Sequence, residues 1–202
     1  MKIGIILYPY GEGKPAGLAR TIFELAHALI RYGTEHEFVV YLKHAPGVTP
    51  QFPGTNWKTE VLGSGLLWLE RLGRATPCDV YVFNTPVMPV LFRPHKSVVL
   101  ALDFAYKYFP ASTFGGRVRN VLMQRYHGFS LRRAGKIIAM SAATKRDIMR
   151  FFGIAGEKIT VGYWGFKHIC SVPPETVDIS GPYFLFIGVV KERKNVFNIV
   201  KG

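Results

Sequence analysis

The fold is decided by residues 3–43, which read IGIILYPYGEGKPAGLARTIFELAHALIRYGTEHEFVVYLK. An apolar run over residues 3–8 is ended by Pro9 and predicts a buried strand. After a loop rich in glycine and proline, apolar residues recur at spacings of three and four, which predicts a helix from Leu18 to Tyr32. A second strand is predicted from Glu37 to Lys43, and a strand, a helix and a strand in this order form the unit of a parallel sheet. The expected buried stripe of the helix consists of Leu18, Ile22, Leu25 and Leu29.

The same alternation continues along the chain. Ser141 can cap a helix that runs to Phe152, with Gly153 as the residue that ends it. Another helix is expected between an aromatic loop, residues 103–116, and about Arg133. Continuous apolar strands separated by helices indicate a parallel sheet covered on both faces, that is, a doubly wound, Rossmann-like α/β fold. Strands are further expected at residues 57–62, 79–83, 97–102, 136–140 and 158–161, and a short helix at residues 66–73.

The pattern also predicts where the first domain ends. Residues 1–170 are expected to form it, and residues 171–181, which contain a Pro-Pro break, read as a linker. Residues 182–202 would then be an incomplete second domain: a strand from Tyr183 to Gly188 and the start of a helix at Lys194. Whether the chain is a fragment or a natural half-protein stays open at this point.

Composition excludes several classes of protein. Of the 202 residues, 49% are hydrophobic, which is too many for a disordered chain, and glycine and proline follow no collagen-like period. No apolar run approaches the length of a membrane span, and the N-terminus lacks the apolar segment of a signal peptide. The two cysteines stand apart in sequence, which favours reduced thiols and a cytoplasmic location.

The charge is strongly basic and concentrated. There are 26 lysines and arginines against 13 acidic residues, and between residues 107 and 150 Asp147 is the only acidic side chain. Such a patch attracts an anionic membrane face, phosphorylated substrates or nucleic acid, although no nucleic-acid recognition motif is present; a solvated face without a partner is the alternative. The predicted patch centres on Arg117, Arg119, Arg125, Arg132, Arg133 and Lys136.

The helix in this region has two interpretations. Arginines flank a stripe of apolar residues, which suits a helix that lies on anionic lipid. The alternative is an ordinary helix whose stripe faces the core. The stripe consists of Val118, Leu122, Tyr126 and Phe129.

Three loops carry candidate ligand-binding residues. Residues 11–17, GEGKPAG, precede the N-terminus of the first helix, where free N–H groups suit an anion; the loop is neither a Walker A nor a dinucleotide motif, and a plain connection is the alternative. Asp103 follows a strand and precedes aromatic residues, a combination that suits sugar hydroxyls and apolar sugar faces, unless Asp103 only caps a turn. Arg193 and Lys194 could clamp a diphosphate.

No motif names a catalytic residue. A Gly-x-Ser-x-Gly elbow, a pair of carboxylates at catalytic spacing and a cluster of metal ligands are all missing from the sequence. We therefore assign no catalytic side chain and expect no metal.

Taken together, four segments resemble the retaining glycosyltransferases of family four, whose GT-B fold has two Rossmann-like domains. The first is AGLARTIFELAHAL (Ala16–Leu29), which looks like the family's glycine loop and first helix, and the second is LDFAYKYFP (Leu102–Pro110), which looks like its acceptor loop. The other two are Met140–Phe166 and Tyr183–Gly202, the latter similar to the opening of the family's donor domain. Two departures stand out: Leu102 occupies the position of a usual histidine before the aspartate, and Ala16 and Ala19 replace common glycines.

The resemblance implies a hexosyltransferase that moves a sugar, with retention, from a nucleotide diphosphate sugar to a membrane-linked or glycan acceptor of the cell envelope. Neither a cofactor nor a metal is implied. Gly17, Arg193 and Lys194 would hold the donor diphosphate, and Tyr10, Asp103 and Tyr106 would face the acceptor. Most of the donor domain would lie beyond residue 202, so the chain alone is expected to be inactive and to need a C-terminal domain or a partner chain. A peripheral position on the inner face of the plasma membrane would fit, and the alternative is a non-catalytic half-protein that binds a membrane or a partner through residues 107–150.

Overall fold

The computed structural model describes residues 1–11, 17–109, 111–165, 181–188, 190 and 194–201. The chain divides into two units, Met1–Tyr163 and Trp164–Gly202. The division falls a few residues before the predicted end of the first domain, and nearly all of the predicted linker lies outside the described residues.

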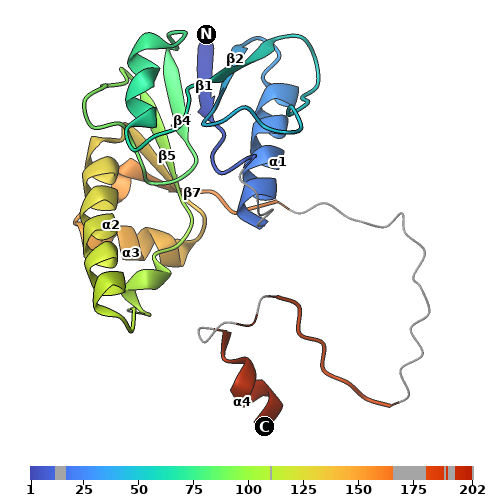
Figure 1. Ribbon diagram of the computed structural model, residues 1–202, viewed down its shortest axis with the longest axis vertical. Coiled ribbons are helices and arrows are strands. Elements are labelled where there is room, and N and C mark those ends of the chain that lie inside the picture. The colour runs from blue at the N-terminus through green and yellow to red at the C-terminus, as the bar shows by residue number, and fades with distance from the viewer. Residues whose placement is uncertain (12–16, 110, 166–180, 189, 191–193, 202) are drawn as a thin grey trace. The chain divides into compact units, whose positions relative to one another are not determined.

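The first unit is built on one parallel sheet of seven strands in the order β3-β2-β1-β4-β5-β6-β7 (Figure 1). The order runs outward in both directions from the pair β1 and β4, so the predicted doubly wound, Rossmann-like fold is confirmed. Every pair of neighbouring strands is parallel, with Ile5 of β1, for example, opposite Val40 of β2 and Val82 of β4. The strands are β1 (Lys2–Ile6), β2 (Glu37–Leu42), β3 (Trp57–Val61), β4 (Val80–Phe83), β5 (Ser97–Ala101), β6 (Lys136–Ala139) and β7 (Ile159–Val161).

Three α-helices connect these strands, together with short 3-10 helices. Ser141 accepts a hydrogen bond from the backbone N–H of Thr144, and Gly153 adopts a left-handed φ of 64°, so both predicted ends of α3 are confirmed. The predicted short helix at residues 66–73 is a 3-10 helix, η1. The bounds are α1 (Gly17–Tyr32), η1 (Trp68–Arg74), η2 (Ala105–Lys107), α2 (Phe114–Arg133), α3 (Ala142–Phe152) and η3 (Gly156–Lys158).

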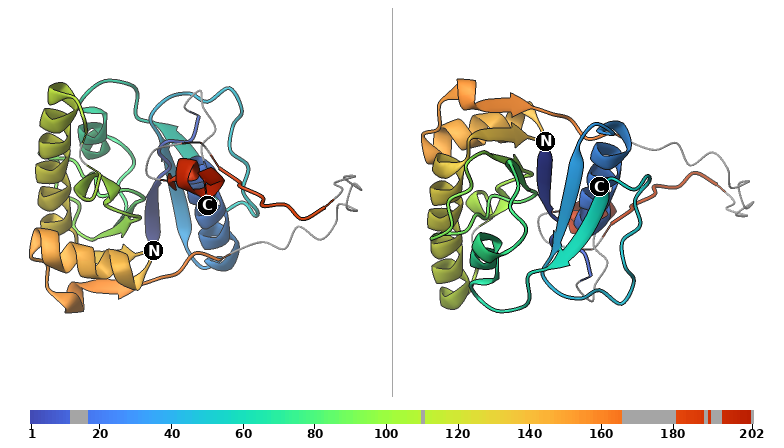
Figure 2. Two further views of the ribbon diagram at one scale, coloured as in Figure 1. Left: turned by 90° about the horizontal axis from the view of Figure 1, so that it is seen from below. Right: turned by 90° about the horizontal axis from the view of Figure 1, so that it is seen from above.

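One face of the sheet is covered from β2 to β7. Helices η1, α2 and α3 pack on it, and Figure 2 shows α2 and α3 on the side of the sheet opposite α1. Its largest fully buried side chains include Tyr41, Phe83 and Ile137. Gly4 lies beneath this face, where a Cβ atom would stand only 2.9 Å from the ring of Tyr41. The large aromatic residues therefore require a glycine on the central strand.

The opposite face is covered only in part. Helix α1 packs on β1 and β2 through Ile22, Ala26 and Ile30, which are the buried residues of the helix. The prediction of which side of the helix is buried was wrong. Of the predicted residues, only Ile22 is among the buried ones, and Leu29 is 37% exposed. Apolar residues surround most of this helix, so their spacing alone did not fix which side meets the sheet.

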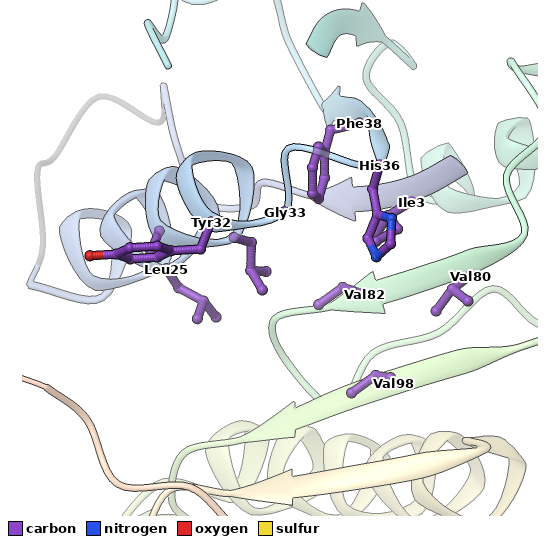
Figure 3. Close-up of a pocket in the computed structure, with 11 residues that line it drawn as sticks. Ile3, Leu25, Tyr32, Gly33, His36, Phe38, Val80, Val82 and Val98 are labelled. Carbon is purple, nitrogen blue, oxygen red and sulfur yellow. The ribbon is translucent and has the colours of Figure 1, made fainter. Parts of the chain in front are cut away.

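A groove of about 490 Å³ lies beside α1 on this second face. Its floor is formed by Val80 and Val82 of β4 and Val98 of β5, and Figure 3 shows these valines and Leu25 of α1 pointing into the same space. The lining is almost wholly apolar. Strands β4 and β5 are thus covered on one face and partly open on the other.

The second unit contains one short helix, α4 (Val196–Lys201), among its described residues. The predicted strand from Tyr183 to Gly188 is wrong, because these residues have no strand conformation and most of their side chains are exposed. A strand needs a neighbour to satisfy its backbone N–H and C=O groups, and the described part of this unit provides none.

In the described part of the chain, no helix is both long and apolar enough to cross a membrane. Helix α2 has 20 residues, but five of them are arginines.

Candidate functional site

The carboxyl ends of β1 and β4 lie side by side at the point where the strand order reverses. In open α/β sheets, ligands bind in the crevice outside the carboxyl ends of the strands at such a switch point. The loops that follow β1, β4 and β5 all leave the sheet at this edge, because the strands are parallel. We call this region, residues 7–11, 84–92 and 102–109, the carboxyl edge.

Asp103 lies at this edge and forms a turn. Its Oδ1 accepts a hydrogen bond of 3.1 Å from the backbone N–H of Ala105, where η2 begins. The carboxylate is otherwise exposed. Asp103 therefore performs the turn function that was the alternative interpretation, while its charge remains accessible to a ligand.

Tyr106 is held against α2. Its hydroxyl lies 3.0 Å from Nδ1 of His127, and Phe104, fully buried, packs edge-on against both rings. Burial lowers the pKa of His127 to about 4. Burial, with a smaller effect of the Asp103 charge, raises the pKa of Tyr106 to about 12. Both rings are thus uncharged at neutral pH, and their hydrogen bond fixes the loop that carries Asp103.

Sequence reasoning did not identify His127 as a site residue. It has no acidic or cysteine neighbour at a catalytic spacing, and its partner is 21 positions away in sequence. Only the packing of α2 on the β5 loop brings the two together. The sequence contained no local signal that could have revealed this pair.

Tyr10 is placed elsewhere. Its ring stacks on Phe23 of α1, 5.7 Å between centroids, and its hydroxyl donates to the carbonyl of Val48. It packs with the core on the α1 side of the sheet, whereas Tyr106 packs with the core on the covered face. The structure brings Asp103 and Tyr106 together and leaves Tyr10 apart from them.

The predicted donor residues are only partly described. Gly17 is the first residue of α1, and a Cβ there would meet nothing within 4 Å. Lys194 is exposed, whereas Arg193 lies outside the described residues. Their proposed joint action on a diphosphate therefore stays a prediction.

The predicted basic patch is centred on α2, which has two different halves. The C-terminal half is anchored by Gly128, Ser130 and Leu131, which are buried. The N-terminal half projects apolar side chains into solvent, with Phe114 83% and Leu122 63% exposed. The helix contains no acidic residue. The exposed basic residues of the patch are Arg117, Arg119, Arg125, Arg132 and Lys136.

Arg133 differs from the other patch residues. It is half-buried, and its guanidinium donates to the carbonyls of Pro89 and Phe92, at 3.3 and 3.2 Å, and to that of Val90. On the other side of this segment, the carboxylate of Glu70 accepts the backbone N–H groups of residues 90–92. Arg133 and Glu70 thus hold the loop after β4 between α2 and η1. Arg133 is therefore not part of the basic patch.

Across the described residues, no group of His, Cys, Asp and Glu is arranged to hold a metal ion. The polar groups of the carboxyl edge are hydrogen-bond donors and acceptors, with Asp103 supplying an exposed charge. This arrangement suits the binding of hydroxyl-bearing molecules.

Comparisons with known proteins identify the family. The chain matches glycosyltransferase family 4 over residues 15–167. Two structures of the wall teichoic acid polymerase TagF, one of a substituted form, are similar, with TM-scores of 0.46 and 0.47 and identities of 12% and 11%. The likeness covers 79–80% of this chain but 37–38% of those chains, so this chain spans less than half their length. No curated protein matches it. Because the family match covers most of the sequence, including residues 84–92 and 102–109 of the carboxyl edge, the chain belongs to glycosyltransferase family 4.

Proposed function

We propose that the first unit is the acceptor-binding half of a retaining hexosyltransferase. The observation that carries this proposal is the position of Asp103 and Tyr106 together at the carboxyl edge of a family 4 domain. The reaction transfers a sugar from a nucleotide diphosphate sugar to a glycan or lipid-linked acceptor, and the configuration at the anomeric carbon is retained.

On the acceptor side, the exposed carboxylate of Asp103 accepts hydrogen bonds from sugar hydroxyls. Hydrogen bonds to a charged acceptor are stronger than those between neutral groups, so this contact orients the acceptor. His127 supports the site indirectly, because its neutral ring holds Tyr106 and with it the loop that carries Asp103.

On the donor side, Gly17 leaves room for the diphosphate near the N-terminus of α1, and Arg193 and Lys194 neutralise its charge as it departs. This part of the proposal needs no metal or other cofactor. A donor site of this kind also requires groups from a further domain or a partner chain, so residues 1–202 alone are proposed to be inactive.

The N-terminal half of α2 is proposed to place the enzyme on an anionic membrane at the cytoplasmic face, where an envelope glycan on a lipid carrier would be extended. Exposed apolar side chains such as Phe114 and Leu122 enter the interface, while Arg117 and Arg119 meet the lipid headgroups.

A transfer assay tests the proposed reaction. The protein, at the length at which its source cell makes it, is incubated with radiolabelled nucleotide diphosphate sugars and a lipid extract of the same cells. We expect label in a lipid or glycan product with the anomeric configuration of the donor, and no product with residues 1–202 alone. Inversion would contradict the retaining mechanism. Label released only as free sugar would show hydrolysis of the donor and contradict transfer to an acceptor, whereas no labelled product of any kind would favour the non-catalytic binding protein.

A further inference from the structure

A second, smaller cavity opens at the carboxyl edge. It has a volume of about 240 Å³ and lies between the ends of β1 and β4 and the start of η1. Its polar lining comes from Asn84 and Thr85, directly after β4, and its aromatic lining includes Tyr8 and Trp68. None of the sequence motifs pointed to this cavity.

Asn84 is the unusual residue of this cavity. It is only 2% exposed, and its Nδ2 has no hydrogen-bond partner in the described structure. A buried amide without a partner costs free energy, and native proteins contain few of them. A ligand oxygen in the cavity would supply the missing acceptor.

The other walls indicate what the ligand is. The rings of Tyr8 and Trp68 lie 5.6 Å apart at 44°, and such faces suit the apolar C–H face of a sugar ring. No charged residue among those the structure describes lines the cavity, so a phosphate or carboxylate would be buried there without a charged partner from them, at a high cost. The volume is below the roughly 300–1,000 Å³ of pockets for larger ligands, which favours a single ring.

The cavity is held in shape by its surroundings. The segment after Thr85 is fixed by Glu70 and Arg133, as described above. In addition, the hydroxyl of Tyr126 donates to the carbonyl of Met88 at 2.6 Å, and the Oγ of Ser130 accepts the N–H of Met88. The position of Asn84 is therefore determined by the fold before any ligand arrives, which lowers the entropic cost of binding.

We infer that this cavity is a subsite for one neutral sugar unit of the acceptor, with the Nδ2 of Asn84 donating to an oxygen of that sugar. The inference rests on the proposed function, because it assigns the sugar to the acceptor. Tyr8 and Trp68 provide the stacking surfaces, and Thr85 offers a hydroxyl. The free amide of Asn84 is stabilised when the subsite is filled.

The test is a titration of the 202-residue chain with methyl glycosides of glucose, galactose, mannose and N-acetylglucosamine, followed by NMR. We expect at least one glycoside to shift the amide signals of Thr85 and Val87 and the indole signal of Trp68. Asn84→Leu should raise the dissociation constant of that glycoside about five- to tenfold. The same variant should raise the Tm by about 2–4 °C, because it removes a buried donor without a partner.

Asn56→Leu is the matched control. The amide of Asn56 donates to the carbonyls of Gly33 and His36, so its loss should lower the Tm and leave glycoside affinity unchanged. Thr85→Val is a second variant that should weaken glycoside binding while keeping the shape of the side chain. A lower Tm for Asn84→Leu with unchanged glycoside affinity would overturn the inference and make Asn84 a structural residue.

The two proposals fail in different ways. Suppose that glycosides shift only the amide signals of Asp103 and Tyr106, and that Asn84→Leu binds them as tightly as the wild type. The subsite proposal is then wrong, while the proposal of an acceptor-binding half remains. If no glycoside shifts any signal at the carboxyl edge, the subsite is also wrong, and the transfer assay decides separately whether the protein is a transferase.

Discussion

The two faces of the sheet carry residues from the same strands but have different surroundings. On β6, Ile137 is fully buried under α2 and α3, while its neighbour Ile138 is only partly covered. On β5, Val99 is fully buried, whereas Val98 lines the open groove. The covered face therefore provides most of the packing energy of β4 to β7.

The difference also explains where the candidate site is rigid. The elements that cover the first face, η1 and α2, supply Glu70, Arg133 and His127, which hold the loops of the carboxyl edge. No comparable contact from the open groove reaches those loops among the described residues. Stability and site geometry thus depend on the same face.

The largest expected effect comes from truncating each isoleucine of β6. Ile137→Ala should lower the free energy of unfolding by about 2–5 kcal/mol, because it leaves a cavity in close-packed surroundings. Ile138→Ala should cost about 1 kcal/mol, since its side chain is partly in water already. Urea denaturation of the two variants measures both values. Equal losses would show that the open face is covered in solution.

A pH effect is expected from His127 on the covered side. Its pKa is about 4 in the native protein, while an unfolded histidine has a pKa near 6.5, so between these values the unfolded chain binds more protons. The contribution of neutral His127 to the free energy of unfolding is therefore fully present above pH 6.5. It falls by as much as about 3 kcal/mol as the pH drops to 4. Urea denaturation of the wild type and of His127→Gln across this range checks it. If both lose the same stability between pH 6.5 and 4, His127 is not the group responsible.

A smaller effect is expected from the hydrogen bonds between Arg133 and the loop after β4. Arg133→Met should destabilise the chain by about 2 kcal/mol, because carbonyls of the loop after β4 lose a charged donor. Arg119→Met, at an exposed position of the same helix, is the control and should change stability by less than about 0.5 kcal/mol. Thermal unfolding compares the two variants, and similar Tm values would show that the hydrogen bonds of Arg133 do not stabilise the loop.

The smallest effect on stability is expected for the exposed arginines of α2. Replacing Arg117, Arg119 and Arg125 with Glu should leave the free energy of unfolding nearly unchanged. Affinity for vesicles that contain anionic lipid should fall about fivefold for each positive charge removed, and further for the added negative charges. Co-sedimentation with anionic and with neutral vesicles measures this, and unchanged binding to anionic vesicles would reject the membrane proposal.

Local patterns were sufficient to predict most of the sheet and its connections. The strands expected from the sequence include all seven strands of the sheet, and the cap residues Ser141 and Gly153 located the ends of α3. The strand predicted at residues 183–188 has the right composition but no neighbour to pair with in the described structure. Composition describes a strand's preference, whereas pairing decides whether it forms.

The site was less predictable for the same reason. Asp103 and Tyr106 were found because they follow a strand within one loop. His127 and Asn84 matter because of what the fold places, or fails to place, against them. The local sequence around His127 does not reveal its distant partner, and that around Asn84 does not reveal that a partner is missing.

The central claim is that the carboxyl edge of this sheet binds the acceptor. The most direct test is the steady-state kinetics of Asp103→Asn in the protein at the length at which its source cell makes it. The asparagine keeps an oxygen for the N–H of Ala105 but removes the charge. The acceptor KM should rise roughly tenfold with the donor KM unchanged. A raised donor KM with an unchanged acceptor KM would contradict the account.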